Sequence, residues 1–168
     1  MGWDTKGGTT DPIKWAAKMK DAPRDAINIF AFSVFNRVVM RTPVDTGALR
    51  QNWLVSINEE DHSVLGAEVK YKKIKKRKGE NAGKIVTKRS VKLERSANDT
   101  MRAGQMACTF AQGDDKIIIQ NNLPYARRIE YGHSKIQAPQ GMVGLVLAQA
   151  DRLWNAAVKA AKSLHGEK

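Results

Sequence analysis

Hydrophobic side chains recur at helical spacing in three parts of the chain. In residues 24–40 and 142–164 the apolar positions lie three and four residues apart over several turns. A shorter repeat covers residues 97–110 and ends before Gly113 and Asp114, whose residue types favour a turn. The pattern predicts two long helices, one near each end of the chain, and a short helix between them.

Between these helices the pattern changes to the alternation that is typical of strands. Residues 53–57 alternate, residues 59–61 are acidic and suit a turn, and residues 64–71 form a second alternating run. We expect these two runs to pair as a hairpin. A further strand is expected at residues 116–120, where a continuous apolar run predicts burial on both faces or a tight edge.

Helices at both ends and a few short strands predict an α+β fold, in which a small, mostly antiparallel sheet is packed by an N-terminal helix and a long C-terminal helix. A chain of 168 residues suits one domain, which we assign to residues 11–168. Residues 1–10 are rich in glycine and threonine and are expected to form a flexible arm. Trp3 is the residue expected to anchor this arm on a partner.

The positive charge of the chain is concentrated in one segment. The formal net charge is +12, and residues 70–95 alone hold twelve lysines and arginines against two glutamates, a net +10. Glycines and few large apolar side chains predict a long mobile loop at about residues 71–95. We expect this loop to contact duplex DNA without sequence preference, or else an acidic protein partner. The residues expected to make this contact are Lys72, Lys73, Lys75, Lys76, Arg77, Lys78, Lys84, Lys88 and Arg89.

Residue types that carry catalysis or bind metals are sparse and poorly spaced. His62, His133 and His165 lie far apart, and neither an HExxH motif nor a paired Cys/His spacing occurs. Cys108 is the single cysteine and lies in a predicted helix, so we expect a packed small hydrophobe. We therefore expect no catalytic residue, cofactor or metal site. A nuclease built on a carboxylate cluster is the weakest alternative, because the acidic residues lack the spacing of a metal site.

No part of the sequence favours a membrane protein. Apolar runs stay well short of the roughly 20 residues that cross a bilayer. The first ten residues also lack the charged-then-apolar order of a signal peptide. We expect a protein that is made in the cytoplasm.

The stretch NNLPYARRIEYGHS, residues 121–134, contains the most specific combination of residue types. Its asparagines and proline favour a tight turn, and its tyrosines and arginines are the types that interfaces enrich. A folded turn and a docking surface are both consistent with it. The residues that we expect to face a neighbouring subunit or an adjoining ring are Tyr125, Arg127, Arg128, Glu130 and Tyr131.

The motif PVDTGALR, residues 43–50, follows the first long helix. Its proline stops that helix, and Asp45, Thr46 and Gly47 favour a side-chain-bonded turn. A subunit contact through Asp45 is the alternative interpretation. A third motif, APQGMV, opens the last predicted helix.

In this order, the three motifs resemble the tail-completion or neck proteins of long-tailed bacteriophages, which join tail to head. The resemblance spans roughly residues 27–161. The matching positions are Pro43, Asp45, Thr46, Gly47, Leu49, Asn122, Pro124, Tyr125, Ala126, Glu130, Tyr131, Gly132, Ser134, Gly141 and Met142.

The resemblance implies a non-enzymatic virion protein, made in the cytoplasm of a bacterial host. It further implies a ring at the head-proximal end of the tail, most often of six subunits and alternatively of twelve, with double-stranded DNA in its channel. The neighbours would be the tail tube, a tail terminator or a head-side connector. The basic segment is longer than the resemblance leads us to expect. A basic DNA-binding protein that acts outside the virion neck is therefore the alternative function.

Overall fold

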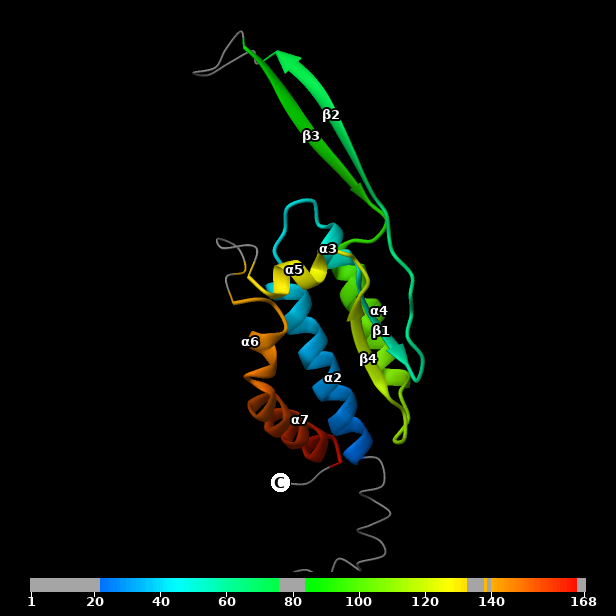
Figure 1. The fold of residues 1–168 in the computed structure, drawn as a ribbon. Coiled ribbons are helices and arrows are strands. Elements are labelled where there is room, and N and C mark those ends of the chain that lie inside the picture. Colours follow the sequence, from blue (N-terminus) through cyan, green and yellow to red (C-terminus); the bar gives the residue numbers. More distant parts are fainter. Residues whose placement is uncertain (1–21, 76–83, 133–137, 139, 166–168) are drawn as a thin grey trace, which may run out of the picture.

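The structure is a computed structural model and describes residues 22–75, 84–132, 138 and 140–165. Its centre is helix α2 (Ala22–Arg41), which packs against α7 (Ala150–Leu164) and α4 (Ala97–Phe110) (Figure 1). Strands β1 (Trp53–Ile57) and β4 (Ile117–Asn121) form a two-stranded antiparallel sheet, and β1 contacts α4. The predicted α+β class is confirmed, with helices near both ends of the chain and antiparallel strands between them.

The core lies around the second half of α2. Phe35, Val38 and Val39 are almost completely buried, since the wide apolar stripe of this helix faces α4 on one side and α6 and α7 on the other. Gly104 of α4 allows the two helices to approach closely, because a Cβ atom at this position would overlap the ring of Phe35. The other buried members of the cluster are Val34, Leu49, Trp53, Ala126, Met142, Val146 and Leu153.

The strands pair differently from the prediction. The expected hairpin between residues 53–57 and 64–71 is wrong, because β1 pairs with β4, with Trp53 opposite Asn121. The chain leaves β1 at Asn58, which has a positive φ of 65°. The Asn58 N–H donates to the Lys116 carbonyl (2.8 Å), and Asn58 Oδ1 accepts from the Lys116 N–H (2.9 Å). These bonds fix the start of β4 beside the end of β1.

The basic segment is a hairpin and not a long mobile loop. Strands β2 (Ala67–Lys75) and β3 (Ile85–Leu93) pair antiparallel and project away from the helices (Figure 1). The predicted loop at residues 71–95 is therefore wrong for the described residues; residues 76–83 lie outside them. The prediction failed because Val69 lies opposite Val91, and such cross-strand apolar pairs are invisible in either strand alone. We call β2 and β3 the β-arm.

Local elements agree better with the sequence. Helix α4 has the predicted bounds, and β4 is shifted by one residue from the predicted strand. The expected helix over residues 142–164 is instead divided into α6 (Gly144–Leu147) and α7, because the chain turns at residues 148–149. The short helices α3 (Ala48–Gln51) and α5 (Ala126–Glu130) escaped prediction, since so few residues show no periodicity. Within the described part of the chain, no helix has the length and apolar character of a bilayer span.

Candidate functional site

The PVDTGALR motif forms the turn that leads from α2 into α3. Gly47 has a φ of 89°, a left-handed conformation that glycine adopts without steric cost, and Thr46 Oγ1 accepts from the Ala48 N–H (3.1 Å). This is the side-chain-bonded turn that the sequence predicts. Asn121 Nδ2, at the start of the second motif, donates to the Leu49 carbonyl (2.8 Å). A pocket between this turn and α5 is lined by Pro43, Asp45, Thr46, Gly47, Leu49, Tyr125 and Ile129.

Glu130 joins the second motif to the third. Its Oε2 accepts from the N–H groups of Met142 (2.7 Å) and Val143 (2.8 Å), and its Oε1 accepts from the Gly144 N–H (2.8 Å). Burial raises the pKa of Glu130, but the three hydrogen bonds outweigh burial, so the pKa lies below its ordinary value. Gly141 is required beside it, because a Cβ atom would overlap the Glu130 carbonyl and carboxylate.

The expectation that Glu130 faces a neighbouring subunit stays a prediction, but the structure gives this residue a role within its own chain. Its carboxylate holds the backbone of its own chain at the entry to α6. The sequence could not reveal this role, because backbone N–H groups are present at every position and only the fold selects those that Glu130 reaches.

The other residues predicted for an interface on α5 are on the surface. Tyr131 is 76% exposed and Tyr125 is 40% exposed, while Arg127 and Arg128 are also exposed. The Arg127 guanidinium lies over the Tyr131 ring, with Cζ 5.8 Å from its centroid, a cation–π arrangement. These four side chains are available to a partner, and their role in an interface stays a prediction. Trp3 lies outside the described residues.

Asp45 and Arg89 form an ion pair between the turn and the β-arm. The two distances are 2.8 Å from Nη1 to Oδ1 and 3.0 Å from Nη2 to Oδ2. The hydrogen bonds with Arg89 hold the pKa of Asp45 below its ordinary value. We predicted Asp45 at a subunit interface and Arg89 on an anionic partner. Both stay predictions: the two charges pair within the chain, while the Asp45 side chain remains 75% exposed.

Two buried amides that the sequence analysis missed hold the root of the β-arm. Gln51 Nε2 donates to the Gly66 carbonyl (2.7 Å), and Gln51 Oε1 accepts from the Arg95 N–H (3.1 Å). Asn52 Oδ1 accepts from the Leu65 N–H (2.7 Å), and Asn52 Nδ2 donates to the Leu65 carbonyl (3.0 Å). The segment that enters β2 and the segment that leaves β3 are thus both hydrogen-bonded to buried side chains. The only sequence signal was two adjacent amides just before a strand.

The predicted DNA-contact residues are divided between the two strands and the segment that joins them. Lys72, Lys73 and Lys75 lie on β2, and Lys88 lies on β3; all four are exposed. Lys84 directly precedes β3 and is also exposed. The remaining members of the predicted set, Lys76, Arg77 and Lys78, lie outside the described residues.

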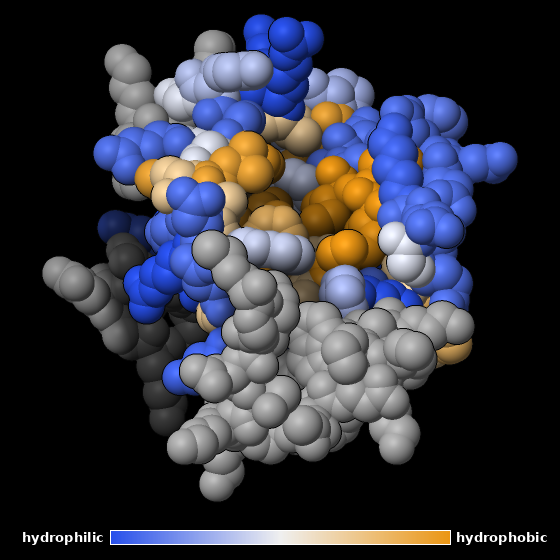
Figure 2. All heavy atoms as spheres, turned by 90° about the horizontal axis from the view of Figure 1, so that it is seen from below, coloured by the Kyte–Doolittle hydropathy of each residue, from blue (hydrophilic) through white to orange (hydrophobic). Residues whose placement is uncertain are grey.

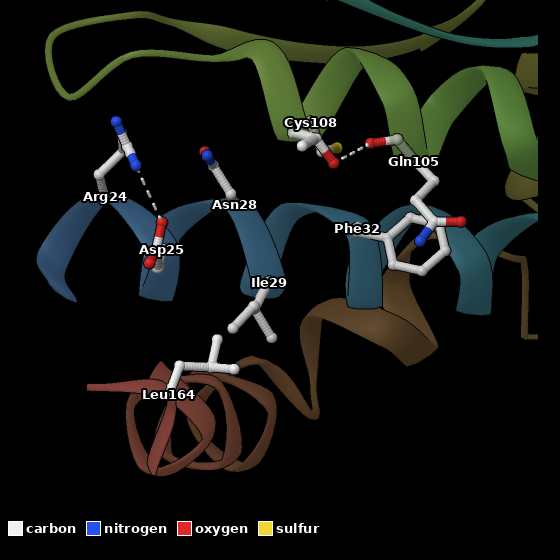
Figure 3. Close-up of a pocket in the computed structure, with 9 residues that line it drawn as sticks. Arg24, Asp25, Asn28, Ile29, Phe32, Gln105, Cys108 and Leu164 are labelled. Atoms are coloured by element: carbon white, nitrogen blue, oxygen red, sulfur yellow. Dashed lines mark hydrogen bonds and ion pairs between the residues drawn. The ribbon is translucent and has the colours of Figure 1, made fainter. Parts of the chain in front are cut away.

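A separate pocket opens among α2, α4 and the end of α7 (Figure 3). At its rim Asp25 pairs with Arg24 (3.4 Å) and His165 (2.9 Å). Cys108 is 1% exposed, as predicted for a packed residue, and burial raises its pKa to about 11, so the thiol stays protonated at neutral pH. In the described ranges, no group of three His, Cys, Asp or Glu side chains is placed to hold a metal ion.

The end of the molecule opposite the β-arm is partly apolar. Seen from that end, hydrophobic side chains surround a hollow between hydrophilic rims (Figure 2). The ends of α2, α4 and α7 expose Ile27, Phe110 and Leu164, respectively. In its described residues, this surface is partly apolar and thus differs in chemistry from the basic β-arm.

Comparison of the chain with models of known protein families, with curated proteins and with solved structures gives no match. The resemblance to phage neck proteins therefore stays a prediction that rests on the ordered motifs. What the structure adds is the contact among these motifs: Asn121 binds the first of them, and Glu130 binds the third.

Proposed function

We propose that the protein is a structural subunit of the head–tail junction of a long-tailed bacteriophage. In this proposal it forms a ring at the head-proximal end of the tail, with double-stranded DNA in the channel. The observation that carries the proposal is that the three motifs contact one another. Asn121 of the second motif bonds to Leu49 of the first, and Glu130 of the second bonds to the backbone of Met142 in the third. Motifs recognised by their order in the sequence thus meet in space. Their polar groups are used to hold backbone, which suits a rigid docking surface.

The exposed face of α5 is the proposed contact between subunits. Tyr125, Arg127, Arg128 and Tyr131 offer large side chains with polar ends, which are the residue types enriched where protein surfaces meet. The helix that carries them is held through Glu130, so little backbone entropy is lost on docking. We propose six copies, with twelve as the alternative. The adjoining rings would be the tail tube, a tail terminator or a head-side connector.

The second candidate is a basic DNA-binding protein that acts outside the virion. The exposed lysines of the β-arm favour it, because a dense positive surface binds nucleic acid without any assembly. The two candidates differ in location and in copy number per particle. They are therefore separable by experiment.

The deciding experiment is mass spectrometry of purified particles of the phage that encodes the chain, combined with electron microscopy of the neck. We expect a constant copy number per particle and density for the chain between head and tail. Removal of the gene should leave filled heads and free tails. A chain that is abundant in infected cells but missing from particles would overturn the proposal and favour the second candidate.

The proposed subunit contact has its own test. The charge reversal Arg128→Glu should reduce the yield of joined particles without changing the melting temperature of the isolated subunit, because Arg128 is exposed. Lys159→Glu makes the same charge change at an exposed position of α7 and serves as the control. Equal yields for the two variants would contradict a contact through α5.

A further inference from the structure

The two faces of the β-arm carry different residues. In the antiparallel register Lys72 lies opposite Lys88 and Tyr71 lies opposite Arg89, and alternate residues point to opposite faces. We call one of these the Lys face; it contains Glu68, Lys70, Lys72, Val86, Lys88, Ser90 and Lys92. The opposite face contains Ala67, Val69, Tyr71, Lys73, Lys75, Ile85, Thr87, Arg89, Val91 and Leu93.

Contacts within the chain determine which face points outward. Arg89 reaches Asp45, and the Leu93 side chain lies so close to Gly47 that a Cβ atom there would approach it to 2.8 Å. Both Arg89 and Leu93 belong to the opposite face, so this face is turned toward the loop after α2. The Lys face therefore points away from that loop.

The Lys face contains a pair of like charges that does not stabilise the hairpin. Lys72 and Lys88 are direct cross-strand neighbours, an arrangement that is destabilising. Glu68 is the acidic residue of this face and bonds to Lys70, with Nζ 2.9 Å from Oε1. Among the residues that the structure describes, no acidic side chain pairs with Lys72, Lys88 or Lys92. A two-stranded hairpin is only marginally stable. The charge repulsion between Lys72 and Lys88 is therefore easier to explain if a bound anion neutralises it.

Duplex DNA is the anion that fits this surface. Alternate residues of a strand lie about 6.8 Å apart, so Lys70 and Lys72 present closely spaced positive charges, and duplex DNA carries one negative charge per about 1.7 Å of its axis. A two-stranded ribbon also fits the major groove. The Lys face has no aromatic residue, and Tyr71 lies on the opposite face, so the base stacking used for single strands has no platform here.

We propose that the Lys face of the β-arm binds the phosphate backbone of duplex DNA, while Arg89 and Leu93 of the opposite face hold the arm to the turn after α2. The inference rests on the proposed function for its place in the virion, where it identifies the surface that meets the DNA of the channel. The contact itself requires only the single chain. It can therefore be measured before any assembly.

The test uses the full chain and a fluorescent duplex of random sequence, with anisotropy measured over a series of salt concentrations. The double variant K72Q/K88Q removes two charges from the Lys face. K73Q/K75Q removes two charges from the opposite face of the same arm and is the matched control. We expect K72Q/K88Q to weaken binding at least about tenfold and to reduce the salt slope by about 1.8, whereas the control changes affinity less than about twofold.

Several outcomes would overturn the inference. Equal losses of duplex affinity for the two double variants would mean that binding depends on the total charge of the arm and not on the face that carries it. Tighter binding to single strands, or binding by the wild-type chain to an acidic polypeptide but not to duplex at low salt, would assign the arm to another partner. The melting temperature of K72Q/K88Q should equal or exceed that of the wild type, since a repulsion is removed; a decrease would contradict the uncompensated pair.

Failure of this inference is distinguishable from failure of the proposed function. If the chain is missing from particles while K72Q/K88Q still loses duplex binding, the junction proposal fails and the Lys face stands. If the chain is present in the neck and both double variants bind DNA as the wild type does, the junction proposal stands and the inference about the Lys face fails.

Discussion

Asp45 and Arg89 are joined by two parallel hydrogen bonds, which tie the turn after α2 to the middle of β3. This ion pair is a second attachment of the β-arm, beyond the buried Gln51 and Asn52 at its root. A hairpin held only at its root could swing about that point. With two attachments its faces keep a defined orientation relative to the helices, and the Lys face is directed outward.

The substitution Asp45→Asn should loosen the β-arm with little effect on global unfolding. It removes the charge that orients Arg89, but exposed ion pairs contribute little to stability. Hydrogen exchange of the amides in β2 and β3 should become faster, while the urea midpoint stays close to wild type. Glu59→Gln removes an exposed carboxylate elsewhere and should leave the exchange rates unchanged. Unchanged exchange in Asp45→Asn would show that the root alone holds the arm.

The same ion pair predicts a pH dependence of the arm. The pKa of Asp45 is lowered in the folded chain, so its stabilising contribution is fully present above the unfolded pKa of about 4 and is lost as the pH falls through the lower folded value. Exchange in β3 should therefore accelerate at acid pH in the wild type, after correction for intrinsic rates. The acceleration should be smaller in Asp45→Asn, which has no carboxylate to protonate.

The substitution Glu130→Ala should destabilise the whole domain. Three N–H groups at the entry to α6 would lose their acceptor, as in the loss of a helix cap, which costs about 1 kcal/mol or up to about 2 kcal/mol. Urea unfolding measures the change. Glu130→Gln keeps one acceptor oxygen and should lose less, and Glu60→Ala, at an exposed position, should lose almost nothing. A loss in Glu130→Ala no larger than in Glu60→Ala would contradict the linking role.

Gly104→Ala should destabilise the packing between α2 and α4, although alanine is the better helix former. The new methyl group would overlap the buried ring of Phe35 and force the helices apart, at a cost of about 1–3 kcal/mol. Gly113→Ala is the matched control, because a Cβ atom there meets nothing within 4 Å. Equal unfolding midpoints for the two variants would contradict the close approach.

Thr42→Val should test a buried hydrogen bond at the end of α2. Thr42 Oγ1 accepts from the Trp53 indole N–H (2.7 Å) and donates to the Val38 carbonyl (2.7 Å). Valine preserves the shape but leaves the buried indole without an acceptor, at a cost of about 1–3 kcal/mol. Thr42→Ser keeps the hydroxyl and should retain more of the stability. If Thr42→Val unfolds at a higher urea concentration than Thr42→Ser, the hydrogen bond is not the stabilising feature.

Much of the secondary structure was predictable from single stretches of sequence. The apolar spacing in residues 24–40 and 97–110 reports a helical face directly, and the isoleucine run at residues 117–119 reports a strand. Cys108 was placed correctly as a packed residue for the same reason, since it lies on the apolar side of its helix. Each of these predictions needed only neighbours within a few turns.

The candidate site was less accessible to sequence reasoning. The turn around Gly47 was predicted because its residue types solve a local backbone problem. The roles of Glu130 and Arg89 were not, because a carboxylate and a guanidinium look the same in the sequence whether they meet a partner subunit, a nucleic acid or their own backbone. Burial of Gln51 and Asn52 was equally hidden, since amides are usually exposed.

The sequence by itself determined the α+β class, the main helices, the strand after α4 and the position of the positive charge, because these depend on spacing and composition over short distances. Only the tertiary structure decided that β1 pairs with β4, that the basic segment is a two-faced arm, and that Glu130 and Asp45 bind within the chain. The physical reason is that pairing between distant segments depends on which surfaces the whole fold brings together. Many pairings satisfy the same local pattern, and packing selects one.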